Sequence, residues 1–266
     1  MEKMGKVVLS MPSKTDYIGV FDSGVGGISV LKELVRLMPE ENYLYFGDSA
    51  NAPYGNRTTA QIRQLTLEKA EYLYSRGMKA LVVACNTATS AAIDALREKY
   101  PELIVVGIEP ALKVAADRYP GGHIGVMATP VTLNEEKFNG QLERFPQVRV
   151  EKLPIAGLVE QIEAGIVDTE ETERLLSAQL APFADCLDAV VLGCTHYPFV
   201  KKTISKILGK NTQLLDGGAG TASQTRRRLA QADLLNTGPG SVQIENSLGT
   251  QEILQLSMQL LEMGDI

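Results

Sequence analysis

The sequence predicts an α/β fold with two pseudo-symmetric, doubly wound domains, each built on a parallel sheet, and an interdomain cleft. Short runs of Val, Ile and Leu lack polar alternation, which is typical of strands buried on both faces. Longer segments with apolar residues at three- and four-residue intervals separate these runs, as the helices of βαβ units do. A faint internal repeat indicates that the second half of the chain folds like the first.

The repeat consists of three pairs of segments that match at nearly constant shifts of 106 to 109 residues. The pairs are residues 18–23 with 124–129, 80–87 with 189–196, and 106–109 with 214–216. Chance could produce one such pair, but hardly three in nearly the same register. Ligands of open α/β sheets bind beyond the carboxyl ends of the strands, so two facing domains would form an active-site cleft between them.

Helical spacing recurs in seven segments: 29–37, 61–74, 90–100, 158–164, 170–180, 223–235 and 251–263. The first three lie in the first half of the chain and the next two in the second half, where they should cover the sheets. The last two lie beyond the repeat, in the stretch from residue 219 onward. They could pack on either domain.

Composition and charge argue against several classes of protein. The chain has 266 residues, of which 44% are hydrophobic, so it can fill a sizeable core. A formal charge of −6 and a pI near 5.2 argue against a nucleic-acid or anionic-membrane partner. No apolar run is long enough to span a membrane, and we expect residues 1–16 to form a loose extension. Three cysteines without a CxxC pair argue against disulfides and favour the cytoplasm.

Two of these cysteines occupy matched positions of the repeat. Cys85 and Cys194 each follow a predicted strand and precede a polar pair and a helix. In facing domains the two thiols would lie opposite each other, and the positive end of a helix would favour their thiolate forms. Each could also be an ordinary buried cysteine, but the matched pair favours function. The third cysteine, Cys186, is expected in the core.

Polar residues gather at other predicted strand ends. His196 lies two residues after Cys194, where it could assist proton transfer or simply pack. Asp22 and Ser23 open a glycine-rich loop that allows close backbone approach to a ligand, or else they cap a helix. The loop is not a dinucleotide fingerprint, since Ser29 stands where the third glycine would be.

Other candidate residues have weaker signals. Tyr54 and Gly55 lie in a turn-rich segment typical of a surface loop, Glu163 is typical of a solvated helix carboxylate, and His123 is expected in a connecting turn. The arginines at 226–228 should form an exposed helix face. Two distant histidines and separate cysteines lack metal-ligand spacing, and nothing calls for pyridoxal phosphate. We therefore expect neither a metal nor an organic cofactor.

Four motifs together resemble the glutamate racemases of the aspartate/glutamate racemase family. They are FDSGVGG at 21–27, PYG at 53–55, ACNTA at 84–88 and LGCTHYP at 192–198. The resemblance runs in order and spacing from Tyr17 to about Gly218. It implies cofactor-independent racemisation of L-glutamate to D-glutamate for peptidoglycan synthesis, by a cytoplasmic homodimer. It also implies that the C-terminal segment returns to the first domain, so that residues 1–112 and 220–266 form one domain and residues 113–219 the other.

The resemblance also implies a role for individual residues, motif by motif. Cys85 and Cys194 would be the acid/base pair, with Asp22 supporting Cys85 and His196 supporting Cys194. Cys194 would deprotonate L-glutamate and Cys85 would deprotonate D-glutamate, while Glu163 matches a carboxylate near the site. Nine residues would bind glutamate: Asp22, Ser23, Tyr54, Gly55, Asn86, Thr87, Thr129, Thr195 and His196.

Three other functions fit parts of the sequence. A racemase of another amino acid, such as aspartate, would share the two-cysteine plan. A non-catalytic amino-acid-binding protein would share the two facing domains, but it needs no paired thiols. A thiol amidase or hydrolase would use one cysteine with His196 and would release a new product rather than an enantiomer.

Overall fold

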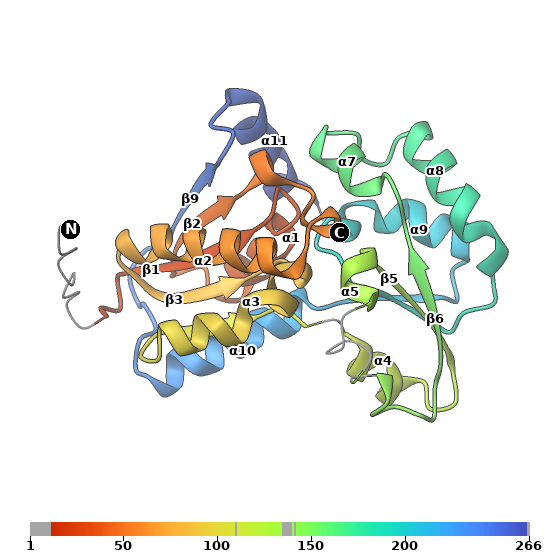
Figure 1. Ribbon diagram of the computed structural model, residues 1–266, viewed down its shortest axis with the longest axis horizontal. Helices are drawn as coiled ribbons and strands as arrows, with labels where there is room; N and C mark the ends of the chain where they lie inside the picture. Colours follow the sequence, from red (N-terminus) through yellow and green to blue (C-terminus); the bar gives the residue numbers. More distant parts are fainter. Residues whose placement is uncertain (1–11, 110, 135–139, 141, 265–266) are drawn as a thin grey trace.

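The computed structural model describes residues 12–109, 111–134, 140 and 142–264. Its strands form two sheets, one on each side of the molecule in Figure 1, and all strand pairings are parallel. The two-sheet α/β architecture expected from the sequence is confirmed. Most of the expected N-terminal extension lies outside the described residues.

The first sheet has the strand order β4-β3-β1-β2-β9 and the second has the order β6-β5-β7-β8. The first contains β1 (Tyr17–Asp22), β2 (Asn42–Gly47), β3 (Met78–Val83), β4 (Ile104–Gly107) and β9 (Ser241–Asn246). The second contains β5 (His123–Ala128), β6 (Arg149–Pro154), β7 (Ala189–Leu192) and β8 (Gln213–Asp216). Strands that match in the repeat occupy equivalent places: read from β4 and from β8, both sheets follow the same order, and β9 is an addition to the first.

Ten described α-helices surround the sheets. Those that follow the first four strands are α1 (Ile28–Leu37), α2 (Thr59–Ser75), α3 (Asn86–Lys99) and α4 (Leu112–Arg118). The second half contributes α5 (Pro130–Asn134), α7 (Leu158–Glu163), α8 (Glu170–Leu180) and α9 (Lys201–Leu208). The C-terminal helices are α10 (Gly218–Gln231) and α11 (Gln251–Glu262).

Both faces of the first sheet are buried, which explains its runs of apolar residues. On β1, Val20 packs in the core cluster that contains Leu31 of α1, while Phe21 packs in the cluster that contains Ile62 of α2. Successive side chains of a strand point to opposite faces, so a strand with helices on both sides needs apolar residues at every position. The carboxyl ends of the strands are thereby left as the polar edge of the sheet.

The C-terminal segment lies against the first sheet. Strand β9 pairs in parallel with β2 and lies beside it in Figure 1. Helices α10 and α11 both pack on α1. The sequence repeat alone left this packing open. The helix expected at 223–235 begins earlier, at Gly218, because its first turn consists of small residues that carry no apolar spacing.

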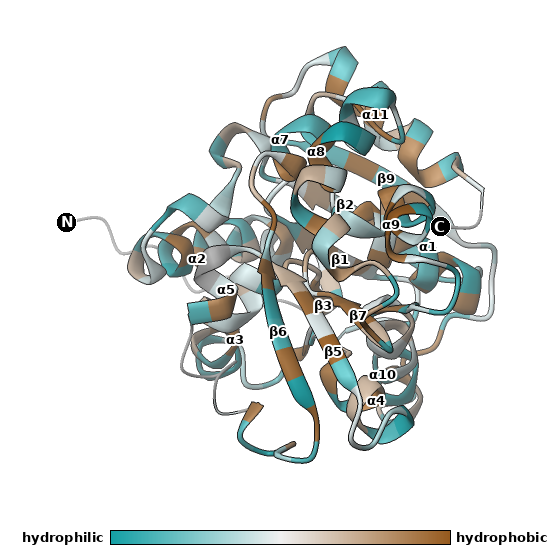
Figure 2. Cartoon of the chain, turned by 90° about the vertical axis from the view of Figure 1, so that its right-hand side faces the viewer, coloured by the Kyte–Doolittle hydropathy of each residue, from teal (hydrophilic) through white to brown (hydrophobic). Residues whose placement is uncertain are grey.

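The edge strands are more polar than the central ones. In Figure 2, hydrophilic residues (teal) interrupt the hydrophobic ones (brown) along β6, whose side chains are partly exposed. No helix in the described part of the chain is long and apolar enough to cross a membrane.

Candidate active site

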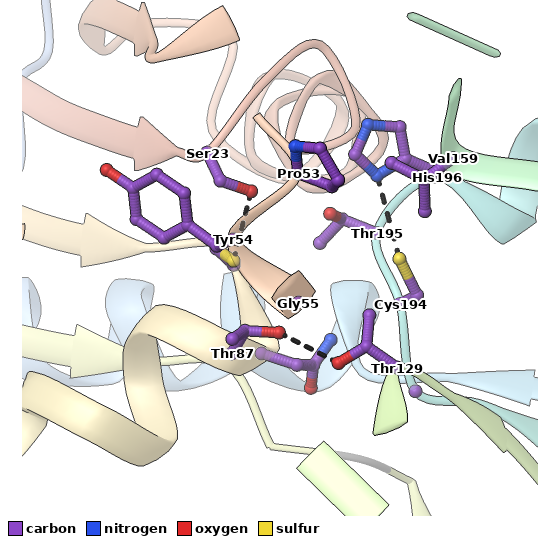
Figure 3. Close-up of a pocket in the computed structure, with 13 residues that line it drawn as sticks. Ser23, Pro53, Tyr54, Gly55, Thr87, Thr129, Val159, Cys194, Thr195 and His196 are labelled. Atoms are coloured by element: carbon purple, nitrogen blue, oxygen red, sulfur yellow. Dashed lines mark hydrogen bonds between the residues drawn. The ribbon is translucent and has the colours of Figure 1, made fainter. Parts of the chain in front are cut away.

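A small pocket lies where the carboxyl ends of the two sheets meet, and both matched cysteines line it (Figure 3). Its lining residues are Ser23, Pro53, Tyr54, Gly55, Cys85, Asn86, Thr87, Thr129, Val159, Gly193, Cys194, Thr195 and His196. The space inside it measures about 20 Å³, room for about one water molecule. The structure thus brings together, from both halves, most of the residues that the resemblance assigned to substrate.

Cys85 lies at the junction of β3 and α3. It is the N-cap residue of α3, where its sulfur accepts a hydrogen bond from the Ala88 N–H at 3.4 Å and lies 3.3 Å from Ser23 Oγ. Burial, followed by the charge of Asp22, raises the pKa of Cys85 to about 12, and the bonds from Ser23 and Ala88 offset only part of this. The helix end does favour the thiolate, through the Ala88 N–H, but burial outweighs this effect.

Cys194 has a different environment at the end of β7. Its sulfur lies 3.6 Å from His196 Nδ1, and the chain continues into a 3₁₀ helix, η4 (Tyr197–Val200), before α9 begins at Lys201. The helix expected directly after Cys194 is thus delayed by several residues. The close charged neighbour of this thiol is a histidine rather than a helix end.

His196 forms a buried ion pair with Glu163, and their atoms Nε2 and Oε1 are 2.6 Å apart. Burial alone would lower the pKa of His196, but hydrogen bonds to Cys194 and Glu163 outweigh it and hold that pKa well above its ordinary range. Burial likewise opposes the charge of Glu163, yet His196 and hydrogen bonds from Val25 and Ser49 keep the pKa of Glu163 below its ordinary value. The pair is an imidazolium and a carboxylate at neutral pH.

Glu163 therefore belongs to the site and is not the solvated helix carboxylate that its sequence surroundings indicate. It ends α7 in the second half and reaches across to the first. Its Oε1 accepts from the Val25 N–H at 2.7 Å, and its Oε2 accepts from Ser49 Oγ at 2.9 Å.

Asp22 is fully buried at the end of β1. Its Oδ1 accepts from the Gly24 N–H at 2.9 Å, and its Oδ2 accepts from Thr195 Oγ1 at 3.0 Å. Burial raises the pKa of Asp22 to about 6, although the charge of His196 and these bonds act against that rise. The bond from Thr195 leads to the Cys194 side of the pocket, and Asp22 acts on Cys85 through its charge.

Several lining groups have a polar atom available to a ligand. Asn86 Oδ1 is buried and has no hydrogen-bond partner among the described residues. Thr87 Oγ1 lies 3.2 Å from Thr129 Oγ1 and 3.3 Å from Thr132 Oγ1, in a cluster of hydroxyls that spans the two halves. Tyr54, by contrast, donates its hydroxyl to Asp48 at 2.8 Å, so it contributes its ring and backbone to the pocket.

The glycine-rich loop after β1 allows the halves to approach closely. A Cβ on Gly24 would lie 1.8 Å from Glu163 Oε1, and one on Gly26 would lie 2.4 Å from His196 Nδ1. The loop therefore needs glycine for contact with the second half of the chain, and Ser29 adds a hydrogen bond to the Thr195 carbonyl at 2.8 Å.

Two minor expectations are wrong. Cys186 is exposed instead of packed in the core, because it follows a short 3₁₀ helix at the surface. His123 is the first residue of β5 and not part of a connecting turn. The arginines at 226–228 are exposed as expected.

Some site residues had no signal in the sequence. Thr132 and Val159 lie in segments without a motif, and Ser49 lies in a loop that resembles any polar strand exit. Thr132 and Ser49 reach the site through partners distant in the chain, whereas Val159 lines the pocket directly. In the described residues, no group of three or more His, Cys, Asp or Glu side chains could hold a metal ion.

Residues 18–225 match the family described as Asp/Glu/Hydantoin racemase. The chain belongs to this family. Racemases are isomerases, and this racemase is 50% identical over 256 residues to a glutamate racemase of Clostridium botulinum, covering 95% of this chain and 99% of the relative. A glutamate racemase of Clostridium acetobutylicum is also 50% identical, over 257 residues.

Solved structures of the family share the fold. Glutamate racemase from Francisella tularensis, in complex with D-glutamate, superposes on this racemase with a TM-score of 0.81, 29% identity and coverage of 94% and 95% of the two chains. The Escherichia coli enzyme, in complex with L-glutamate and an activator, gives a TM-score of 0.82 at 32% identity, with coverage of 92% and 95%.

Proposed function

We propose that this racemase interconverts L- and D-glutamate by proton exchange between Cys85, Cys194 and the substrate α-carbon, without a cofactor. The observation that carries the proposal is the pair of buried thiols in one small pocket, at matched strand ends of the two halves. The relatives that are 50% identical are named glutamate racemases, and two solved relatives are complexes with D- and L-glutamate. These names support glutamate as the substrate.

In the proposed reaction each thiol serves one face of the substrate. The Cys194 thiolate takes the α-proton of L-glutamate, and the electron pair of the broken C–H bond stays on the α-carbon as a carbanion conjugated with the carboxylate. The Cys85 thiol then donates its proton to the opposite face and becomes a thiolate, giving D-glutamate. The reverse reaction runs with the roles exchanged.

The surroundings of the two thiols differ. Burial and the charge of Asp22 raise the pKa of Cys85 and favour its thiol form, whereas Cys194 Sγ lies 3.6 Å from His196 Nδ1. We therefore propose that Cys85 is the proton donor when L-glutamate is the substrate.

The lining polar groups would bind and stabilise the substrate. The unpartnered Asn86 Oδ1 fits the substrate ammonium, and the hydroxyls of Thr87, Thr129 and Ser23 fit its carboxylates. Hydrogen-bond donors around the α-carboxylate in a nearly dry pocket would stabilise the carbanion, which an ordinary thiolate could not form in water.

Isotope labelling tests the mechanism and substrate together. The purified protein is incubated in deuterated water with L-glutamate or, separately, L-aspartate, and early samples are resolved by chiral chromatography and mass spectrometry. We expect turnover of glutamate, with deuterium in new D-glutamate while recovered L-glutamate stays largely protiated, because different thiols serve the two faces. Equal early labelling of both enantiomers would contradict the two-cysteine mechanism, and turnover of aspartate alone would contradict the substrate.

We further propose that the product serves peptidoglycan synthesis, that the enzyme is a homodimer, and that it works in the cytoplasm, where its thiols stay reduced. We also propose domain limits at 1–112 with 220–266, and 113–219; the pairing of β9 with β2 supports the return of the C-terminal segment. Rescue of a D-glutamate auxotroph tests the first role, and light scattering of the purified protein tests the dimer.

A further inference from the structure

The C-terminal edge strand β9 ends beside the active site. Its last residue, Asn246, is buried and pairs in register with Gly47, the last residue of β2. A Cβ on Gly47 would lie only 2.9 Å from Asn246 Nδ2, so the amide fits closely against the strand end. This packing places the amide next to η1 (Ser49–Asn51).

The hydrogen bonds of the Asn246 amide determine which way the Ser49 hydroxyl donates. The Leu248 N–H donates to Asn246 Oδ1 at 3.0 Å, so the NH₂ group faces Ser49 Oγ and donates to it at 2.9 Å. A serine hydroxyl has one hydrogen, and this one is directed to Glu163 Oε2 at 2.9 Å. Asn246 therefore makes Ser49 a donor toward Glu163.

The bonds continue from Glu163 to the thiol. Glu163 Oε1 accepts from His196 Nε2 at 2.6 Å, and His196 Nδ1 lies 3.6 Å from Cys194 Sγ. Two other titratable groups face the Glu163–His196 pair: Asp22 of β1 and Tyr45 of β2, both of them buried. Ser49 and Asn246 do not line the pocket, so they reach the chemistry only through Glu163.

We propose that Ser49 and Asn246 are positioning residues for the Cys194 half of the reaction. They hold the Glu163 carboxylate in place, so that the Nδ1–H of His196 stays directed at the Cys194 sulfur. The inference rests on the proposed function and deepens it. Asn246 lies beyond the part of the chain that matches the family, residues 18–225. The added strand β9 thus contributes to the mechanism as well as to the sheet.

The test compares variants that change this hydrogen-bond chain with one that leaves it intact. Ser49→Ala removes the donor, and the isosteric Asn246→Asp replaces an NH₂ donor by an acceptor that turns the Ser49 hydrogen away from Glu163. Ser49→Thr keeps the hydroxyl. The matched control is Ser247→Ala, because Ser247 Oγ accepts from the Ala50 N–H at 3.0 Å between the same two segments without reaching Glu163.

The first readout needs no substrate. Alkylation of Cys194 by iodoacetamide is followed across pH by peptide mass spectrometry, with Cys85 measured in the same digest. The hydrogen bond from Ser49 helps to keep the pKa of Glu163 low, so without it the carboxylate stabilises the His196 imidazolium less well. We therefore expect the midpoint of Cys194 alkylation to rise by about one pH unit in Ser49→Ala and Asn246→Asp. The midpoints of Ser49→Thr and Ser247→Ala should stay at the wild-type value, as should that of Cys85 in every variant.

The second readout is the pH profile of kcat/KM with both enantiomers. We expect its acidic limb to move upward with the alkylation midpoint, and kcat/KM to fall equally in both directions, because enantiomers are equally stable. Unchanged midpoints in both Ser49→Ala and Asn246→Asp would overturn the inference. A wild-type protein that fails to racemise glutamate would overturn the proposed function, while the alkylation midpoints would still decide the role of Ser49 and Asn246.

Discussion

The two thiols of the pocket differ in what surrounds them, although they occupy matched strand ends. Cys85 lies near the Asp22 carboxylate and accepts a hydrogen bond from the Ala88 N–H at the start of a helix, whereas Cys194 lies beside His196. The repeat thus accounts for where each thiol lies, but the charged groups around the two thiols are not equivalent.

Removal of either thiol should abolish its half of the proton exchange. We expect Cys85→Ala and Cys194→Ala each to lower the racemisation rate by about 10²- to 10⁴-fold or more, as loss of a general acid or base does. The exposed Cys186 serves as the control, and Cys186→Ala should keep wild-type kcat. Circular dichroism and chiral chromatography measure fold and rate. Near-normal turnover by either pocket variant would contradict the two-base assignment.

Sequence reasoning located most of the pocket residues but few of their contacts. Asn86, Thr87, Thr195 and His196 could be placed because they directly follow predicted strands, whose carboxyl ends meet at one edge. Hydrogen bonds such as that from Ser49 to Glu163 join residues 114 positions apart, and no local pattern predicts them. The strength of burial at Cys85 was equally invisible, because it depends on the packing of two sheets.

Among the elements, helices with regular apolar spacing were predicted well. Where a helix begins with small or polar residues, its first residue was not predicted. Helix α8 (Glu170–Leu180) has the predicted bounds, with Thr169 as its N-cap. Helix α3 begins four residues earlier than its apolar spacing indicates, since Asn86 to Thr89 are small or polar. Strand β9 was not predicted at all, because an exposed edge strand does not need an apolar run.

A buried ion pair holds the C-terminal segment to the first sheet. Lys79 of β3 is fully buried and bonds to Glu41 at 2.6 Å, to the Leu234 carbonyl at 2.9 Å and to the Lys14 carbonyl. Glu41 in turn accepts from the Asn236 N–H at 2.9 Å. The linker between α10 and β9 is thus fixed to β3, which stabilises the placement of β9.

Loss of one partner of this pair should be costly. We expect Lys79→Met to lower the free energy of unfolding in urea by about 3–5 kcal/mol, because it leaves the buried Glu41 carboxylate without its cationic partner. The double variant Lys79→Met/Glu41→Gln should recover much of that loss. Lys206→Met, which breaks an exposed pair with Glu173, is the control and should cost less than about 1 kcal/mol. If Lys79→Met and Lys206→Met lowered the free energy of unfolding equally, the buried pair would have no special structural role.

Over the described part of the molecule, the side-chain hydrogen bonds that join the two halves come largely from residues in or next to the active site. Glu163 of the second half binds Val25 and Ser49 of the first, and Thr195 binds Asp22. These contacts depend on the glycine loop after β1, where side chains would occupy the space that the second half needs.

A methyl group in that loop should disturb the catalytic geometry without unfolding either half. We expect Gly26→Ala to displace His196 and Thr195, whose nearest atoms would lie 2.4 Å and 2.6 Å from the new Cβ, and to lower kcat by about 10²-fold. Gly220→Ala on α10 is the control, since no atom lies within 4 Å of its Cβ position. Small-angle scattering would register any separation of the halves, and a fully active Gly26→Ala would contradict the requirement for close contact.

The 20 Å³ space between the thiols also bears on the speed of the enzyme. Glutamate is several times larger than a water molecule, so the walls of the pocket must move apart before it enters and again before its mirror image leaves. Motions of whole domains take microseconds to milliseconds, and in many enzymes they are slower than the chemical step. We therefore expect each catalytic cycle to require opening of the pocket, at a frequency that would set an upper limit on turnover.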